Sequence, residues 1–441
     1  MNDEQHPPQA LSHPLPAGLR DLLAEETFYR RSLARKILEH FALHAYDLVT
    51  PPAFELAEVL EKGLGTLDPA DVLRFVEPES GEVCALRPDM TPQIARMMAT
   101  RLSSQPAPIR LCYEGTILRR KQGRARKHRQ VPQAGVELYG APAPFGDEEA
   151  LRLLASVSRS IGLESFVIDV GHAGISRSLV EVLPRALAHD VTQALVHKDQ
   201  ARVTSLLSKM DSETVPRSVR RAIEALPNLS GGFTNRTAHD VLAEAKALFR
   251  ETPAEAPLAE LTNLWDSLCS VKPEDAEAMQ DNLQDVLRID LGEVRHFAYY
   301  TGIIFHAVAA GPGEPYASGG RYDDLLGRFG HPMPAIGFAL HLDGVARARN
   351  AAGIFDKRPP RVLVAMDSGG QTAVRTLRAT GIAAVEARQI DNATRYAEAH
   401  GFTHVLTNAG EDHIRVERMY APGADRVVTW DGILKIVEEI K

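Results

Sequence analysis

The sequence contains little cysteine. Among its 441 residues are three, Cys84, Cys112 and Cys269, which stand far apart and form no Cys-x-x-Cys pair. This distribution argues against a disulfide framework and against a thiolate zinc site. No apolar run approaches the roughly 18 residues that a membrane span needs, and the N-terminus has neither the basic start nor the apolar centre of a signal peptide. We therefore expect a cytoplasmic protein.

Several chemical signatures are also missing. The chain has no Gly-x-x-x-x-Gly-Lys-Ser/Thr loop, no His-Glu-x-x-His helix and no Gly-x-Ser-x-Gly turn. His40 and His44 have the helical spacing of metal ligands, but no third ligand stands nearby, so packed or exposed histidines explain them better. The formal net charge is -8, which argues against a protein whose whole surface binds nucleic acid. Any anion site must be local.

The length predicts two to four domains of roughly 100 to 200 residues each. Residues 19–43 have a helical pattern, because Leu33, Ile37 and Phe41 recur on one face. Residues 1–174 and 289–356 together form the expected core. Helical spacing of Ala, Leu and charged residues at 175–288 predicts a helical insertion, and a β-α-β-α-β alternation at 357–441 predicts a small parallel-sheet domain.

Strand patterns predict where the core sheet lies. A strand, a basic loop and a second strand are expected at 111–140, and further strands at 165–171, 299–309 and 335–342. The last two are separated by the glycine-rich stretch 318–325.

A scattered set of polar residues on these segments could form a pocket. Asp89 and Thr91 could accept hydrogen bonds from an ammonium group, while Gln133 and Glu137 share one strand face with Gly135 leaving room between them. The set would suit an amino acid. The pattern by itself favours a simpler interpretation, in which Asp89 caps a helix that starts at Pro92 and Glu137 lies on a solvated sheet face.

The stretch LRRKQGRARKHRQ, residues 118–130, holds seven Lys or Arg in thirteen positions. It is either a solvated hairpin tip or a loop that faces an anion, and so many like charges would repel one another without one. The candidate anion contacts are Arg120, Lys121, Arg124, Arg126, Lys127 and Arg129.

Five ordered motifs make the chain recognisable. LRPDMTPQIARM, YEGTILRR…RQVPQAGVELYG, VRHFAYYTGIIF, SGGRYDDLLG and AIGFALHLD resemble the catalytic core of histidyl-tRNA synthetases over most of the chain. The resemblance implies an α+β fold, a class II synthetase-like core with an antiparallel sheet and flanking helices. It further implies that the C-terminal α/β domain resembles the anticodon-binding module, and that Pro51–Pro52 belongs to a dimer contact.

The same resemblance assigns roles to individual residues. Gln133, Glu137 and Tyr300 would hold an imidazole, with Tyr299 beside them. Asp89 and Thr91 would hold the amino group of the ligand, and Arg119 with Arg295 its carboxylate or phosphate end. Neither a cofactor nor a metal is implied.

The chain departs from the synthetases where they grip ATP. The family pattern Gly-hydrophobic-Glu-Arg becomes His341, Leu342, Asp343 and Gly344, and Phe-Arg-x-Glu becomes residues 118–121, which ends on Lys121. A charge-assisted hydrogen bond contributes about 1.5–3 kcal/mol, and about 1.4 kcal/mol is a factor of ten in rate. We therefore expect adenylation to be lost while histidine binding survives.

This profile resembles the regulatory subunits of ATP phosphoribosyltransferase, synthetase-like proteins of histidine biosynthesis. LRPDMTPQIAR, DVGHAG and YYTGIIFHA carry that resemblance. It implies a non-catalytic protein that associates with the short catalytic subunit, supports its activity and mediates feedback inhibition by L-histidine. A homodimer within that complex is expected, and neither a membrane nor tRNA is an expected partner.

Two other functions stay open at this point. An active histidyl-tRNA synthetase is favoured by the C-terminal domain and by Arg119 and Arg295. Residues 361–441, however, contain ten Lys or Arg and eleven Asp or Glu, a net charge of -1, and show no basic stripe for tRNA. A synthetase-like protein that regulates another process fits the motif losses as well.

Overall fold

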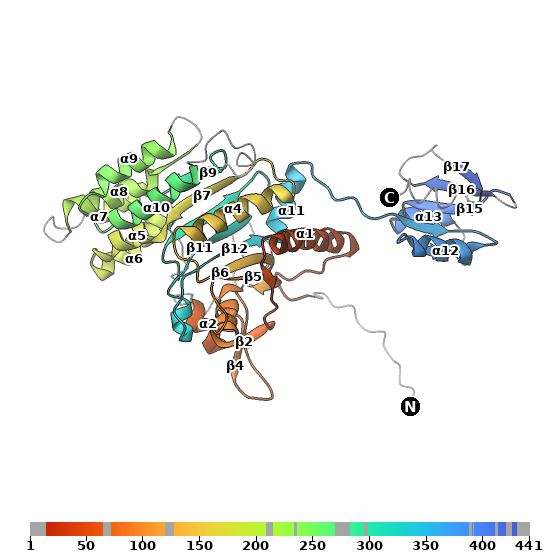
Figure 1. Ribbon diagram of the computed structural model, residues 1–441, viewed down its shortest axis with the longest axis horizontal. Coiled ribbons are helices and arrows are strands. Elements are labelled where there is room, and N and C mark those ends of the chain that lie inside the picture. The colour runs from red at the N-terminus through yellow and green to blue at the C-terminus, as the bar shows by residue number, and fades with distance from the viewer. Residues whose placement is uncertain are drawn as a thin grey trace, which may run out of the picture. The chain divides into compact units, whose positions relative to one another are not determined.

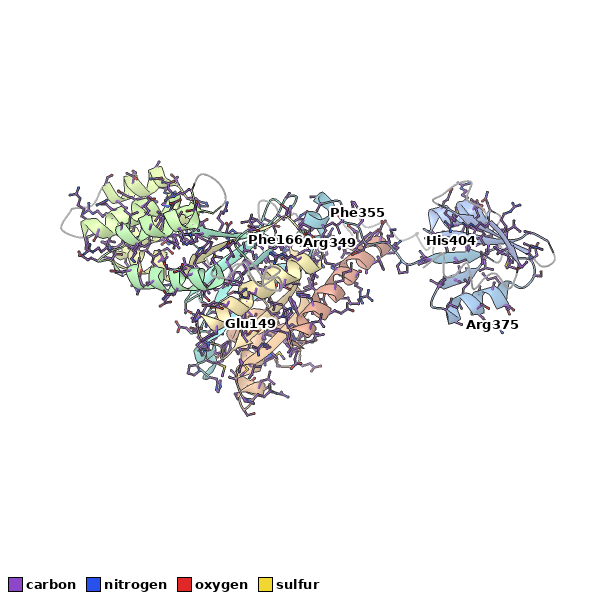
Figure 2. The ribbon with its side chains drawn as sticks, turned by 45° about the horizontal axis from the view of Figure 1, so that its top comes forward. Glu149, Phe166, Arg349, Phe355, Arg375 and His404 are labelled. Carbon is purple, nitrogen blue, oxygen red and sulfur yellow. The ribbon has the colours of Figure 1, made fainter. Side chains whose placement is uncertain are left out.

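The protein was analysed as a computed structural model that describes residues 15–64, 72–119, 128–208, 215–232, 236–269, 283–294, 299–387, 390, 392–410, 413–419 and 426–429. The chain divides into two compact units, Met1–Phe355 and Asp356–Lys441. Figure 2 labels Phe355, where the first unit ends, and His404 of the second. Within the described residues, no helix combines the length and apolar character needed to cross a bilayer.

The first unit is built on a nine-stranded sheet with the order β1-β5-β6-β12-β11-β10-β7-β9-β8. In that order the strands are Asp47–Leu48, Ile109–Leu118, Gln130–Tyr139, Ala335–His341, Ala317–Arg321, Ile303–Val308, Val167–His172, Leu287–Asp290 and Ser230–Gly231. Neighbours pair antiparallel except β1 with β5 and β7 with β9. The expected antiparallel core is therefore confirmed, with a parallel pair towards each edge.

Helices cover one face of this sheet. They are α1 (Ala24–Leu43), α4 (Phe145–Ser160) and α11 (Leu342–Ala351), which Figure 1 shows lying across β5, β6 and β12. The expected helix at 19–43 begins later, at Ala24, but its predicted core residues Leu33, Ile37 and Phe41 are all buried. Apolar residues that recur with the period of a helix lie on one face of it, and this face packs against the sheet. The sequence pattern therefore predicts the buried residues better than the end of the helix.

The opposite face of the sheet carries a smaller apolar cluster. It includes Ile94 of α3 (Thr91–Met97), Leu326 of the 3-10 helix η4 (Leu326–Phe329), and Ile304 of β10. The π-helix η2 (Met98–Leu102) continues α3. This thinner cover matters because it leaves part of the sheet face available for polar side chains.

The glycine-rich stretch 318–325 contains a strand that the sequence did not predict. Its first half belongs to strand β11, which lies between β10 and β12. A Cβ at Gly319 would lie 2.3 Å from the carbonyl oxygen of Gly337 on the next strand. These glycines are there because neighbouring backbones approach closely, a reason that strand propensity does not reveal.

The predicted insertion is helical. Its helices are α5 (Ala173–Glu181), α6 (Arg185–Val196), α7 (Gln200–Ser208), α8 (Arg217–Ala225), α9 (Ala238–Leu248) and α10 (Glu255–Cys269), with a 3-10 turn η3 (Leu226–Asn228). They gather beside β7 and β9 in Figure 1. The insertion also supplies β8 to the main sheet, and its apolar residues are continuous with the core of the first unit.

A small sheet with the order β2-β4-β3 stands apart from the main one. Its strands are Phe54–Leu56, Val83–Leu86 and Arg74–Val76, and α2 (Ala57–Leu64) follows the first of them. The strands expose Phe54, Phe75, Val76 and Val83, and the two phenylalanine rings meet edge to face with centroids 5.2 Å apart.

The second unit has a five-stranded sheet with the order β14-β13-β15-β16-β17. Its elements are β13 (Arg361–Val364), α12 (Gly370–Ala379), β14 (Ala383–Glu386), α13 (Ala393–Ala399), β15 (His404–Asn408), β16 (His413–Arg418) and β17 (Arg426–Thr429). The first three strands are parallel, as the alternation predicted. The antiparallel β16 and β17 were not predicted.

Candidate functional site

A pocket lies on the sheet face that faces away from α1, α4 and α11. Six residues predicted to bind a ligand line it together, although they come from separate parts of the chain: Asp89, Thr91, Arg119, Gln133, Tyr299 and Tyr300. It holds about 380 Å³ of space between atoms, part of which is open to solvent. The lining also includes five residues that the sequence analysis did not single out, namely Ser318, Tyr322, Gly337, Phe338 and Ala339. His341 completes it.

Glu137 lies beneath the pocket and does not line it. Its side chain is buried, accepts a 2.7 Å hydrogen bond from the Thr91 hydroxyl and accepts a second from the Tyr322 hydroxyl. The solvated sheet face suggested for Glu137 by the alternating pattern is therefore wrong. Period-two alternation shows which residues share a face, but it cannot show what covers that face.

Burial raises the pKa of Glu137 to about 8, against the opposing effect of the hydrogen bonds from Tyr322 and Thr91. Asp89 raises it further. A buried carboxyl group in this setting retains its proton more readily than one in water, because its charged form has lost solvation. The hydrogen bonds that Glu137 accepts hold both Thr91 and Tyr322 in place at the pocket wall.

Gly337 makes this arrangement possible. It stands directly across from Glu137 in the β6–β12 register, and a Cβ at this position would lie 2.0 Å from Glu137 Oε2. Any larger residue would displace the carboxylate. The only signal in the sequence was a glycine within an otherwise apolar strand, a pattern that can mark a close approach of this kind.

Asp89 occupies the other side of the pocket. Its carboxylate accepts a 3.1 Å hydrogen bond from the Tyr299 hydroxyl and a longer one, 3.4 Å, from the Thr91 amide. The N-cap position of α3 is Met90 and not Asp89, although Asp89 accepts from the first amide of this helix. Burial raises the pKa of Asp89, and Arg119 opposes that rise because a nearby cation favours the ionised form.

Gln133 and Arg119 add the remaining polar groups. The Gln133 side chain is 2% exposed, and its Oε1 has no hydrogen-bond partner among the described residues. A buried amide oxygen left without a donor costs about 1–3 kcal/mol, so a ligand N–H group is its natural complement. Acceptors at Asp89 and Gln133 and a guanidinium at Arg119 suit a ligand with an ammonium, a second N–H donor and a carboxylate.

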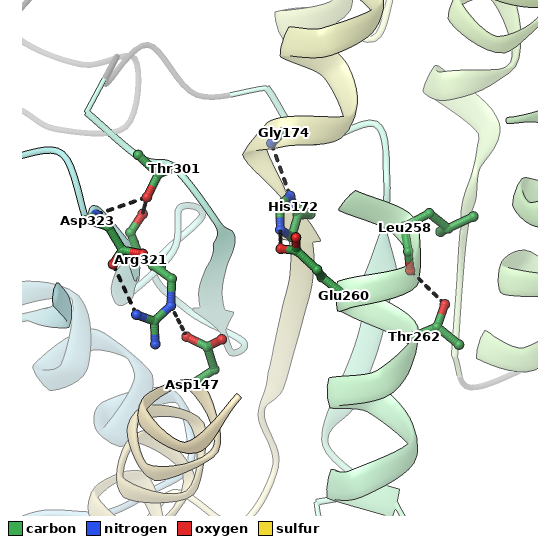
Figure 3. Close-up of polar contacts among 9 residues, drawn as sticks. All are labelled: Asp147, His172, Gly174, Leu258, Glu260, Thr262, Thr301, Arg321 and Asp323. Carbon is green, nitrogen blue, oxygen red and sulfur yellow. Dashed lines mark hydrogen bonds and ion pairs between the residues drawn. The ribbon is translucent and has the colours of Figure 1, made fainter. Parts of the chain in front are cut away.

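The pocket residue Tyr300 is held in position by the backbone that follows it. Thr301 N donates to the carbonyl oxygen of Arg321 at 2.7 Å, and Thr301 Oγ1 accepts from the amide of Asp323 at 2.9 Å. Arg321 in turn is buried and forms ion pairs with Asp147 and Asp323, as Figure 3 shows. This network ties the pocket to the start of α4.

The anion-contacting loop can be followed only at its ends. Arg129 donates through Nε to the Arg119 carbonyl oxygen and through its amide to Gly18. Arg295 and the other predicted anion contacts lie outside the described residues: Arg120, Lys121, Arg124, Arg126 and Lys127.

The start of α11 differs chemically from the motif with which a synthetase grips ATP. Asp343 stands where the synthetase pattern has Glu, and it accepts a 3.0 Å hydrogen bond from Arg20. A Cβ at Gly344 would lie 3.3 Å from Tyr316 Cα and Cβ, a tight fit. A long basic side chain at position 344 would therefore require Tyr316 to move, so the protein lacks both the Arg and ready space for it.

Known proteins with similar sequences belong to the histidyl-tRNA synthetase type. The Histidyl-tRNA synthetase family model matches residues 18–345. An ATP phosphoribosyltransferase regulatory subunit from Anaeromyxobacter sp. (strain K) is 42% identical over 337 residues, which cover 76% of this chain and 90% of that protein. One from Syntrophotalea carbinolica is 30% identical over 98% of this chain and 99% of its own, so relatives of that name also extend through the C-terminal unit.

Solved structures show the same fold. A protein from Bacillus halodurans, titled ATP phosphoribosyltransferase regulatory subunit/histidyl-tRNA synthetase, superposes with a TM-score of 0.76 at 24% identity, covering 91% of this chain and all of that one. Histidyl-tRNA synthetase from Nostoc sp. PCC 7120 gives 0.75 at 19% identity, covering 98% of this chain and all of its own.

The fold and the pocket define a class II synthetase-like protein of the histidyl-tRNA synthetase type. Within that class, the chain belongs to the family of ATP phosphoribosyltransferase regulatory subunits. It is accordingly a non-catalytic regulatory subunit, which agrees with Asp343 and Gly344 at the positions where a synthetase grips ATP.

We expect Gly337→Ala to destabilise the protein by about 2–3 kcal/mol, because the new methyl group forces Glu137 to move in a packed interior. Urea unfolding would measure this change. Gly327→Ala is the matched control, since Gly327 is exposed and the nearest atom to its added Cβ is Pro332 Cβ at 3.8 Å. Equal stability of the two variants would contradict the close approach.

The raised pKa of Glu137 predicts a pH dependence of unfolding. Between the unfolded value of 4.5 and the folded value of about 8, the folded state binds the extra proton, so the free energy of unfolding should fall as pH rises through this range. The limiting slope is about 1.4 kcal/mol per pH unit. Without ligand, Glu137→Gln should give a flatter profile than the wild type from pH 5 to 8; parallel profiles would refute the assignment.

Proposed function

We propose that the pocket binds L-histidine as an effector and that this binding regulates a catalytic ATP phosphoribosyltransferase subunit. The observation that carries the proposal is the unpartnered Gln133 Oε1 in a pocket that also presents Asp89 and Arg119. Asp89 accepts from the ligand ammonium, Arg119 faces its carboxylate, and Gln133 accepts from an imidazole N–H. Each N–H donor of the amino acid thereby faces an acceptor of the protein, and its carboxylate faces a donor.

The family name supports the partner. Relatives covering most of this chain are called regulatory subunits of ATP phosphoribosyltransferase, so a separate catalytic chain is the proposed partner. It would be the short form of that enzyme, which begins histidine biosynthesis. Feedback then follows from linkage: if histidine alters the association of the two chains or the activity of the complex, substrate occupancy on the partner alters histidine affinity by the same factor.

The test is the rate of phosphoribosyl-ATP formation by the short catalytic subunit, with and without this protein and then with added histidine. Stimulation that histidine reverses is the expected result. Gln133→Ala should weaken the histidine effect about tenfold or more while leaving stimulation intact, because it removes an acceptor inside the pocket. Stimulation that histidine does not reverse would refute the effector assignment. A catalytic subunit that this protein does not stimulate would refute the regulatory pairing.

A homodimer is the proposed state of this chain within the complex. The apolar side chains Phe54, Phe75, Val76 and Val83 are exposed together on the small sheet near the Pro51–Pro52 segment. A cluster of this kind on a soluble protein marks an interaction surface, and a twofold contact uses the same patch on both copies.

Val76→Glu should shift the protein from dimer to monomer in light scattering, since it places a charge in the apolar patch. Val427→Glu is the control: Val427 is similarly exposed, at 54% against 62%, but lies in the second unit. A dimer that survives Val76→Glu, or a wild-type protein that is a monomer, would exclude this surface.

A further inference from the structure

The helical insertion contacts the rest of the first unit at two places that bear on this argument, just after β9 and at the pocket residue Tyr300. At the first, the Leu291 amide donates to the Leu229 carbonyl oxygen at 2.9 Å. A Cβ at Gly292 would lie 2.4 Å from the carbonyl oxygen of Leu226, so the two backbones are packed directly together.

An ion pair strengthens the same junction. Lys198, in the connection between α6 and α7, pairs with Asp290 at the end of β9. The Asp290 side chain is 6% exposed, and its other oxygen accepts from the Gly292 amide at 3.2 Å. Residues 290–292 are therefore fixed to the insertion by charge, by backbone hydrogen bonding and by close packing.

The second contact is with the pocket wall itself. Arg177 on α5 donates a hydrogen bond to the Tyr300 carbonyl oxygen, and the Ala173 amide, in the first turn of α5, donates to Gly302 at 2.9 Å. The start of α5 is itself held, because His172 caps it at Gly174 and contacts Glu260 of α10 (Figure 3). α5 thus links the insertion bundle to the backbone of a pocket residue.

We propose that Arg177 is a positioning residue for the effector pocket, and that through it the insertion and the pocket are coupled. This inference rests on the proposed function, because it takes the ligand to be L-histidine. A ligand that contacts Tyr300 meets backbone that Arg177 and the start of α5 hold in place. By reciprocity, a change in the insertion that loosens Tyr300 lowers the affinity for the ligand.

Calorimetric titration of the full chain with L-histidine tests the coupling. We expect Arg177→Ala to weaken binding about tenfold, or about 1.4 kcal/mol, and Arg177→Lys to recover most of the loss, since an ammonium can still donate to the carbonyl. Arg185→Ala is the matched control, because Arg185 carries the same charge on α6 but is exposed. Its affinity should equal that of the wild type.

Hydrogen exchange of the wild-type protein supplies a readout that does not depend on any variant folding. Added histidine should slow exchange at the amides of α5. A purely structural role of Arg177 would instead lower stability while leaving affinity unchanged. Protection confined to the pocket, or unchanged affinity in Arg177→Ala, overturns the inference.

The design separates this inference from the proposed function. If wild-type protein binds histidine and Gln133→Ala binds it about tenfold or more weakly, the effector assignment stands, and normal binding by Arg177→Ala refutes the coupling alone. If the wild-type protein does not bind histidine, both the effector assignment and the coupling fail.

Discussion

The close approach of Glu137 to Gly337 is the constraint on which the pocket depends. A buried carboxylate needs hydrogen-bond donors, and Thr91 and Tyr322 supply them from two different parts of the chain. Those donors are thereby held at the pocket wall. The carboxylate fits because the opposing strand has no side chain at that point. One glycine therefore determines the positions of groups that a ligand meets, although its own side chain contributes no chemistry.

Around this centre, the fold separates recognition from catalysis. Acceptors at Asp89 and Gln133 and the guanidinium of Arg119 remain in one pocket. The region near α11, where a synthetase would grip ATP, has instead an acidic residue paired with Arg20 and a glycine packed closely against Tyr316. Binding of a ligand needs complementary groups in the ground state, whereas activation also requires cations placed for the transition state. The first set of groups can be kept without the second.

Other polar contacts in the first unit are structural. Figure 2 labels Glu149 of α4, which accepts two 2.7 Å hydrogen bonds from Arg110 of β5 and one from Tyr46. Burial and Tyr46's proximity to this carboxylate raise the pKa of Tyr46, so its hydroxyl remains a donor. Such side-chain pairs tie α4 to the sheet on the face opposite the pocket.

The sequence alone determined the class of fold, the helical insertion, the parallel start of the C-terminal unit and half of the residues that line the pocket. Periodicity was sufficient for the helices and strands because it indicates which face of each element is buried. The ordered motifs were sufficient for the class of fold because the same segments recur in one family. Tertiary structure alone decided that Glu137 supports the pocket from beneath, that residues 317–321 form a strand, and that Tyr322 and Gly337 belong to the site. Each of these depends on a contact between strands far apart in the chain, and a local pattern carries no record of what packs against it.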